Sequence, residues 1–212
     1  MRKQLARTFL VAGTAIAAMG LAVPAALAAG TWTVTGGPSF TSSGTGTFTL
    51  TDTTHSATFT CHVGAAAGTV TDQTSGPSPF GSVTSSSFGN SSNKCSGPLG
   101  STGTSNQKAG TTAHINGTSF AGGVTTGTIT GVDHKFTASA FGINCTAEIT
   151  GTAGVTYNNG THVLTFTTAG DNLTVISASG CLGIIQVNDK VTFTGSETVT
   201  GSPTNPIQIS SP

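Results

Sequence analysis

Hydrophobic and polar residues alternate with a period of two along much of the chain, the pattern of β-strands that bury one face and expose the other to water. Between positions 56 and 62, Ala57, Phe59 and Cys61 fall on one face, and threonines and a histidine fall on the other. Similar alternation occurs in the segments 31–35, 47–51, 145–150, 162–168, 172–176, 190–194 and 206–209. No segment after residue 28 shows a convincing 3.6-residue apolar period. The chain is therefore predicted to be all-β.

The predicted strands are short and are separated by turn sequences such as Gly-Gly-Pro at 36–38 and Asn-Asn-Gly at 158–160. Roughly a dozen such strands without helices predict an antiparallel β-sandwich or barrel. Residues 71–79 and 101–112 lack the alternation and are predicted to be long loops. Because no segment has the length and composition of a linker, residues 29–212 are predicted to form a single secreted β domain.

The two halves of the chain share a sequence pattern. The segment GTFTLTD at 46–52 corresponds to GTITGVD at 127–133, and each copy is followed by two cysteines at nearly equal spacing. This correspondence predicts two tandem related halves, with internal repeats at roughly residues 46–100 and 127–200.

The four cysteines predict two disulfides, because the cysteines of exported proteins are usually paired. The duplication favours Cys61 with Cys95 and Cys145 with Cys181, which are 34 and 36 residues apart. The alternative joins Cys61 to Cys145 and Cys95 to Cys181 and would link the two halves. Each favoured bridge would stabilise the fold by about 3–4 kcal/mol if it acts by restricting the unfolded chain.

The first 28 residues have the features of a secretory signal peptide. Three basic residues lie within the first seven positions, an apolar stretch follows at 9–23, and Ala-Leu-Ala occupies 26–28. This pattern predicts cleavage between Ala28 and Ala29. We expect a mature protein without a transmembrane segment, secreted into the medium or held non-covalently at the cell surface.

Removal of the signal peptide would leave a chain with little charge. Four lysines and seven acidic residues remain, a net charge of −3, and no arginine remains. In the whole sequence only 7% of the residues are charged, against about 25% in typical soluble proteins. Nucleic-acid binding is excluded as a function class because it needs clustered positive charge. The same lack of positive charge argues against an anionic membrane surface as partner.

The sequence contains no recognisable catalytic, cofactor-binding or metal-binding motif. The five histidines form no HExxH or His-x-His pair, and neither Cys-x-x-Cys nor Gly-x-Ser-x-Gly occurs. Asp52 and Asp133 occupy equivalent repeat positions, and each is predicted to end a strand and stabilise a turn rather than to act as a glycosidase carboxylate pair. Glu148, Glu197 and His62 are predicted to face water. The prediction is a protein that is not an enzyme and that uses no cofactor or metal.

Four segments carry a resemblance to a known family. They are CSGPLG at 95–100, GVTTGTITGV at 123–132, SGCLG at 179–183 and TFTG at 192–195. In these segments the chain resembles a family of exported actinobacterial proteins that are rich in threonine and glycine, carry four cysteines and have no established activity. The resemblance covers most of the predicted mature chain. It implies a secreted β protein and transfers no catalytic residue.

Together these features favour a secreted or cell-surface structural or adhesive β protein. Its expected partner is the cell wall, an extracellular polymer or a second copy of the chain. The alternative is an extracellular binding module for a carbohydrate or a small apolar ligand, held on a sheet face or in the mouth of a barrel. A third hypothesis is a hydrolase whose residues come together only in the fold; a buried histidine beside a carboxylate and an exposed serine would favour it.

Overall fold

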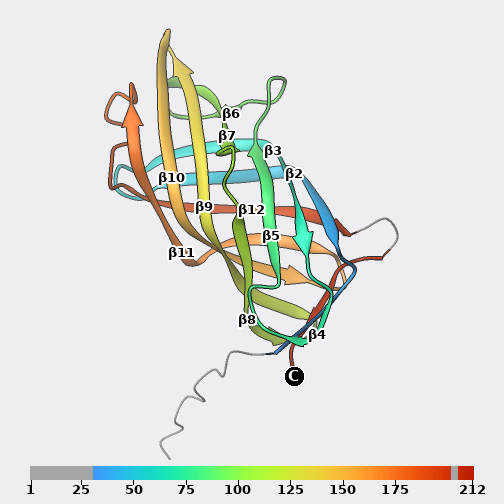
Figure 1. Cartoon of the computed structure of the whole chain (residues 1–212). Helices are drawn as coiled ribbons and strands as arrows, with labels where there is room; N and C mark the ends of the chain where they lie inside the picture. The colour runs from blue at the N-terminus through green and yellow to red at the C-terminus, as the bar shows by residue number, and fades with distance from the viewer. Residues whose placement is uncertain (1–30, 202–204) are drawn as a thin grey trace, which may run out of the picture.

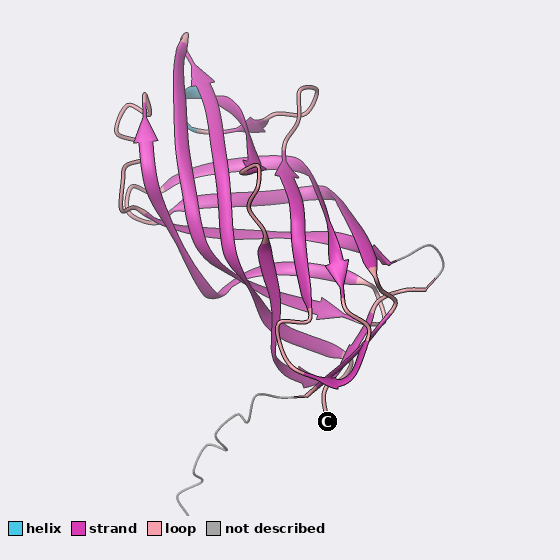
Figure 2. Ribbon diagram, viewed as in Figure 1, coloured by secondary structure: helices cyan, strands magenta, loops and turns pink. Residues whose placement is uncertain are grey.

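The computed structural model describes residues 31–201 and 205–212, so the predicted signal peptide and its cleavage site at Ala28 and Ala29 lie outside the described residues. The described residues form strands and a single 3₁₀ turn, without an α-helix (Figure 2). In chain order the elements are β1 (Trp32–Thr35), β2 (Ser39–Asp52), β3 (Ala57–Val70), β4 (Gln73–Gly76), β5 (Gly81–Phe88), β6 (Cys95–Ser96), η1 (Pro98–Gly100), β7 (Thr102–Gln107), β8 (Ala113–Ala121), β9 (Val124–Ala140), β10 (Ile143–Asn158), β11 (Val163–Ser179), β12 (Lys190–Gly201) and β13 (Gln208–Ser210). The all-β prediction is confirmed. Within this part of the chain, no helix has the length and apolar character needed to cross a membrane.

The largest sheet closes on itself (Figure 1). Its strands follow one another in the order β2, β3, β5, β8, β9, β10, β11 and β12, and β12 pairs back with β2. Every one of these pairings is antiparallel. Of the two expected architectures, the fold is therefore the barrel, in which closure protects the strand edges.

Two short strands, β6 and β7, complete the barrel wall at one end. The first half of β9 pairs with β8, and its second half pairs with β7, which also contacts β5 and β6. The prediction of a loop at 101–112 is therefore wrong for the part that forms β7. The sequence of β7 shows no apolar alternation because its buried positions are taken by small residues, Gly103 and Ser105.

A three-stranded sheet covers the opposite end of the barrel, at the bottom of Figure 1. Its order is β13, β1 and β4, so the segment 71–79, predicted as a loop, also contributes a strand. Trp32 and Val34 of β1 are buried in one hydrophobic cluster with Phe80 and with Ile207 and Ile209 near the C-terminus. The small sheet thus closes the barrel with apolar side chains.

The hydrophobic core of the described residues consists of two clusters stacked along the barrel. The cluster beside the small sheet is built around Trp32, and the other is built around Phe48, Phe59 and Phe136. Both disulfides belong to the second cluster: Cys61 is bonded to Cys95, and Cys145 is bonded to Cys181. This pairing is the one that the duplication favours.

Candidate ligand-binding cavity

The interior of the barrel contains a cavity of about 120 Å³ that reaches both core clusters. Most of its wall is apolar and includes side chains from every part of the barrel, such as Phe40, Leu50, Val83, Ile129, Val155 and Phe166. For comparison, a cavity of about 150 Å³ lined by Leu, Ile and Phe in another protein stays dry and binds benzene. The cavity is therefore of the size and polarity that accept one small hydrophobic ring.

Glu197 lies on the cavity wall and is only 1% exposed. Its Oε2 atom accepts a 2.6 Å hydrogen bond from Oγ of Ser42 on β2. Its Oε1 atom is buried and has no hydrogen-bond partner in the structure. Burial raises the pKa of Glu197, although the hydrogen bond from Ser42 opposes the shift. The expectation that Glu197 faces water is wrong.

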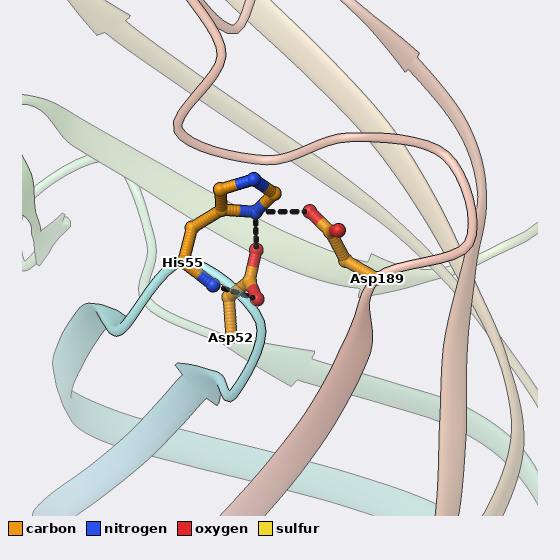
Figure 3. A group of neighbouring side chains, drawn as sticks. All are labelled: Asp52, His55 and Asp189. Carbon is orange, nitrogen blue, oxygen red and sulfur yellow. Dashed lines mark hydrogen bonds and ion pairs between the residues drawn. The ribbon is translucent and has the colours of Figure 1, made fainter.

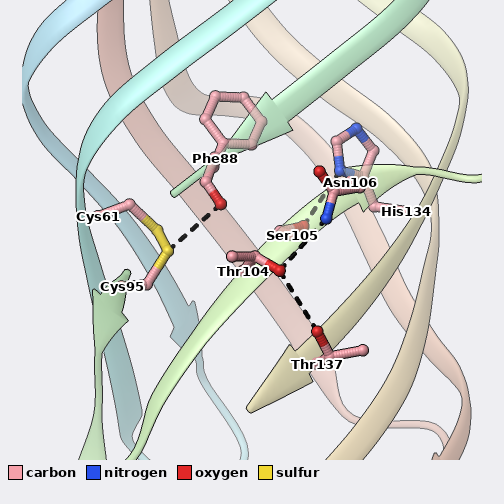
Figure 4. The surroundings of a disulfide bond; sticks show 8 residues. All are labelled: Cys61, Phe88, Cys95, Thr104, Ser105, Asn106, His134 and Thr137. Carbon is pink, nitrogen blue, oxygen red and sulfur yellow. Dashed lines mark hydrogen bonds between the residues drawn. A yellow bond between two sulfur atoms is a disulfide. The ribbon is translucent and has the colours of Figure 1, made fainter. Parts of the chain in front are cut away.

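A second polar group lies where β5, β7 and β9 meet. The two ring nitrogens of His134 lie 2.8 Å from Oγ of Ser86 and 3.1 Å from Oγ of Ser105. Burial lowers the pKa of His134 from 6.5 to about 4, so the ring is neutral at pH 7. Gln107 accepts a hydrogen bond from Ser86 and donates to the carbonyl oxygens of Val83 and Thr111. Figure 4 shows His134 and Ser105 in the same region as the Cys61–Cys95 disulfide.

The strand register places a second unpartnered oxygen in the same transverse row as Glu197. Glu197 pairs with Leu164, Leu164 with Tyr157, and Tyr157 with Thr125. All four residues line the cavity. Tyr157 donates its hydroxyl to the carbonyl oxygen of Ile207, but Oγ1 of Thr125 is buried without a partner. The cavity is thus apolar with a few polar residues, and three of these, Glu197, Thr125 and Asp133, each carry a buried oxygen without a hydrogen-bond partner.

Another cluster joins two loops outside the cavity (Figure 3). Nδ1 of His55 lies 3.0 Å from Oδ2 of Asp189 and 3.5 Å from Oδ2 of Asp52. Oδ1 of Asp52 accepts hydrogen bonds from the backbone N–H groups of Thr54 and His55, so the predicted turn role of Asp52 is confirmed.

These three side chains are the residues that could hold a metal ion in the described part of the chain, since their ligand atoms lie within 4.8 Å of one another. No sequence motif indicates this cluster, because Asp189 is distant in sequence from Asp52 and His55. Burial disfavours ionisation of Asp189, but hydrogen bonds with Asp52 and Gln186 and the neighbouring His55 together lower its pKa. Through the contacts of His55 with Asp52 and Asp189, the cluster connects the β2–β3 turn to the loop before β12.

Of the remaining predicted residues, His62 and Glu148 lie on the outer surface, whereas Asp133 also lines the cavity. His62 is exposed, as expected. Asp133 does not end a strand but lies inside β9, where it and Glu148 surround the amino group of Lys108. Burial raises the pKa of Asp133 despite the charge of Lys108. The predicted equivalence of Asp52 and Asp133 is wrong because β9 continues through a bulge beside Gly131, whose φ is +72°.

Large apolar side chains are exposed at the end of the barrel opposite the small sheet. Leu99, Ile143 and Leu182 line one shallow cleft there, and Phe141 at the tip of the β9–β10 hairpin is 84% exposed. Leu99, Phe141 and Leu182 have φ values of 57°, 51° and 54°, a left-handed conformation that is unusual for bulky residues. We call these four residues the apolar rim.

Neither histidine cluster completes the arrangement expected of a serine hydrolase. Within residues 31–201 and 205–212, His134 hydrogen-bonds with serines but with no carboxylate, whereas His55 contacts carboxylates but no serine. No protein-family model, curated protein or solved structure matches this chain. The cavity and the apolar rim are therefore the features that bear on function.

Proposed function

We propose that the protein is a binding module for one small apolar ligand, held inside the barrel. The cavity carries this proposal, since it combines an apolar wall with a small number of polar atoms, the usual composition of a small-molecule site. The closed sheet supports it, because small barrels hold single ligands in their interior. Of the ligand classes expected from the sequence, a small apolar molecule fits this wall better than a carbohydrate, which needs many hydrogen-bond partners.

Thermal unfolding with a panel of small cyclic hydrocarbons and their derivatives tests the proposal. A ligand at 100 times its Kd stabilises a protein by about 2.7 kcal/mol, so binding raises Tm. Ala66→Leu should abolish the effect, because Ala66 lines the cavity and a larger side chain fills it. Ala65→Leu is the matched control, since Ala65 is exposed. If no compound raises Tm, or if Ala66→Leu leaves the rise unchanged, the binding module is rejected.

The apolar rim supports a second candidate, attachment to an apolar surface at the cell wall, on an extracellular polymer or on another copy. Left-handed backbone is inexpensive for glycine and asparagine but costly for leucine and phenylalanine. Leu99, Phe141 and Leu182 are exposed in this costly conformation. Strained residues of this kind are often retained because they serve a function, here contact with an apolar surface.

A depletion assay tests this second candidate. The protein is mixed with cell walls, insoluble polysaccharide or hydrocarbon droplets, and the supernatant is assayed. Loss onto one material that disappears in Phe141→Asn/Leu182→Asn would support attachment. Ile176→Thr is the control, because Ile176 is exposed but does not belong to the rim. If the unmodified protein, the double variant and Ile176→Thr are depleted equally, the rim is excluded as the attachment surface.

We also infer that the chain acts outside the cytoplasm, as the predicted signal peptide implies. Two disulfides support this location, because such bonds form and persist in oxidising compartments. Mass spectrometry of the protein from the culture medium should find Ala29 as its first residue. Protein found only inside cells, with residues 1–28 still attached, would contradict the inference.

A further inference from the structure

The unpartnered oxygen of Glu197 restricts the chemistry of the ligand. Ser42 occupies Oε2 of this carboxyl group and leaves Oε1 buried without a hydrogen bond. Gly64 on the facing part of β3 has no side chain, and a Cβ atom there would lie 2.8 Å from Oε1. The missing side chain lets Oε1 of Glu197 and the ring of Phe48, whose Cζ atom would lie 2.7 Å from such a Cβ atom, approach the backbone of β3.

A hydroxyl group is the ligand group that best fits this oxygen. A buried polar atom left without a partner destabilises the protein, so a ligand that supplies the missing bond gains affinity. A hydroxyl can donate to an ionised carboxylate and can also accept from a protonated one, so it suits Glu197 in either form. An amine or a carbonyl suits only one of them.

The surroundings of Glu197 require the rest of the ligand to be apolar. Leu164 lies beside Glu197 on β11, Phe166 lies beside Gly195, and Val199 follows on the same face of β12. The cavity volume of about 120 Å³ limits the ligand to about one six-membered ring. Long-chain lipids and sugars are too large or too polar for this space.

We propose that the cavity binds a small hydrophobic alcohol or phenol, with its hydroxyl group hydrogen-bonded to Oε1 of Glu197. This proposal rests on the proposed function as a binding module. It adds the polar group of the ligand and the residue that recognises that group.

Phenol and toluene form a matched pair of probes, because they share the ring and differ by a hydroxyl in place of a methyl group. We would titrate the oxidised protein with each and follow backbone amide chemical shifts by NMR. Phenol should bind at least about 10-fold more tightly than toluene, since only the hydroxyl of phenol supplies the bond that the buried oxygen lacks. In Glu197→Met the preference should disappear or reverse.

Two further variants keep the test decisive. Glu197→Gln retains hydrogen-bonding atoms and should keep part of the preference for phenol, and it serves as the second variant if Glu197→Met does not fold. Thr125→Val removes another unpartnered oxygen of the cavity and should leave the preference unchanged. If the preference is lost only in Thr125→Val, the assignment to Glu197 is overturned.

The outcomes separate this inference from the function on which it rests. If neither probe binds the unmodified protein and the wider panel also fails, the binding module itself is rejected. If toluene binds as tightly as phenol, the binding module stands and the hydroxyl proposal fails. If phenol is preferred equally by the unmodified protein and by Glu197→Met, Glu197 is not the residue that recognises the hydroxyl.

Discussion

Oγ of Ser86 lies 2.8 Å from Nε2 of His134, a contact that joins β5 to β9 inside the barrel wall. Burial lowers the pKa of His134 to about 4, from 6.5 in the unfolded chain. The stability contributed by this residue is therefore fully present above pH 6.5 and is lost as the pH falls toward 4. The shift corresponds to at most about 3 kcal/mol over this range.

His134→Gln tests this dependence, because glutamine does not titrate and can still hydrogen-bond with serine. Urea unfolding from pH 4 to pH 7 should show that the free energy of unfolding of the unmodified protein, minus that of the variant, increases with pH. His62→Gln is the control, since His62 is exposed. A difference that stays constant with pH would show that the His134 ring is not desolvated.

Glu197 should produce a pH dependence of the opposite sign. Its pKa is raised by burial, so its favourable contribution is present below the unfolded pKa of about 4.5 and is lost as the pH rises through the folded value. The free energy of unfolding of Glu197→Gln, minus that of the unmodified protein, should therefore increase with pH above 4.5. Glu148→Gln, on the outer surface, is the comparison. If this difference in the free energy of unfolding decreases above pH 4.5, the buried position of Glu197 is contradicted.

The bond between His55 and Asp189 should stabilise the loops around it. Both Asp52 and Asp189 are buried, and His55 is the basic group that lies against them. Removing one partner leaves buried charge without compensation. We expect His55→Ala to lower the free energy of unfolding by about 1–3 kcal/mol. His114→Ala, an exposed histidine of β8, should change it by less than about 0.5 kcal/mol. Equal effects of the two substitutions would show that the cluster contributes nothing.

The two disulfides should contribute almost equally to stability. They close loops of 34 and 36 residues, for which the chain-entropy model gives about 4 kcal/mol each. Urea unfolding of Cys61→Ala/Cys95→Ala and of Cys145→Ala/Cys181→Ala should show similar losses. Thiol titration should find no free cysteine in either double variant. Two free thiols would instead indicate the alternative pairing of Cys61 with Cys145 and Cys95 with Cys181.

The strands whose alternation uses large apolar residues were predictable from the sequence. Ala57, Phe59 and Cys61 do face the core of β3. The rest of β3 reads His-Val-Gly-Ala-Ala-Ala-Gly, and its small residues give no periodic signal although the strand continues through them. The pattern therefore predicted strands that were too short, and the barrel could not be distinguished from a sandwich.

The inward orientation of two polar cavity residues was predictable from the sequence alternation. Glu197 has the same parity as Phe193 and Val199 in β12, and His134 has the same parity as Phe136 and Ala138 in β9. Because these buried neighbours face the core, the shared parity places Glu197 and His134 on the core-facing side of their strands. The prediction for Glu197 followed instead the rule that charged residues face water. The contact between His55 and Asp189 had no such signal, since it depends on how distant loops meet.

Phe141 should lower the stability of the hairpin that carries it. Phe141 and Gly142 form a two-residue connection between Ala140 and Ile143, with φ values of 51° and 77°. Asn-Gly is the preferred sequence for such a turn because asparagine adopts the left-handed conformation more readily than phenylalanine. Phe141→Asn should therefore raise the free energy of unfolding by about 1 kcal/mol, measured with urea, because the exposed phenyl ring contributes little packing. If the same variant also loses attachment in the depletion assay, the phenylalanine is kept for a surface contact at a cost in stability. A loss of stability in Phe141→Asn would show instead that the ring supports the fold, and the apolar rim would then need no partner to explain it.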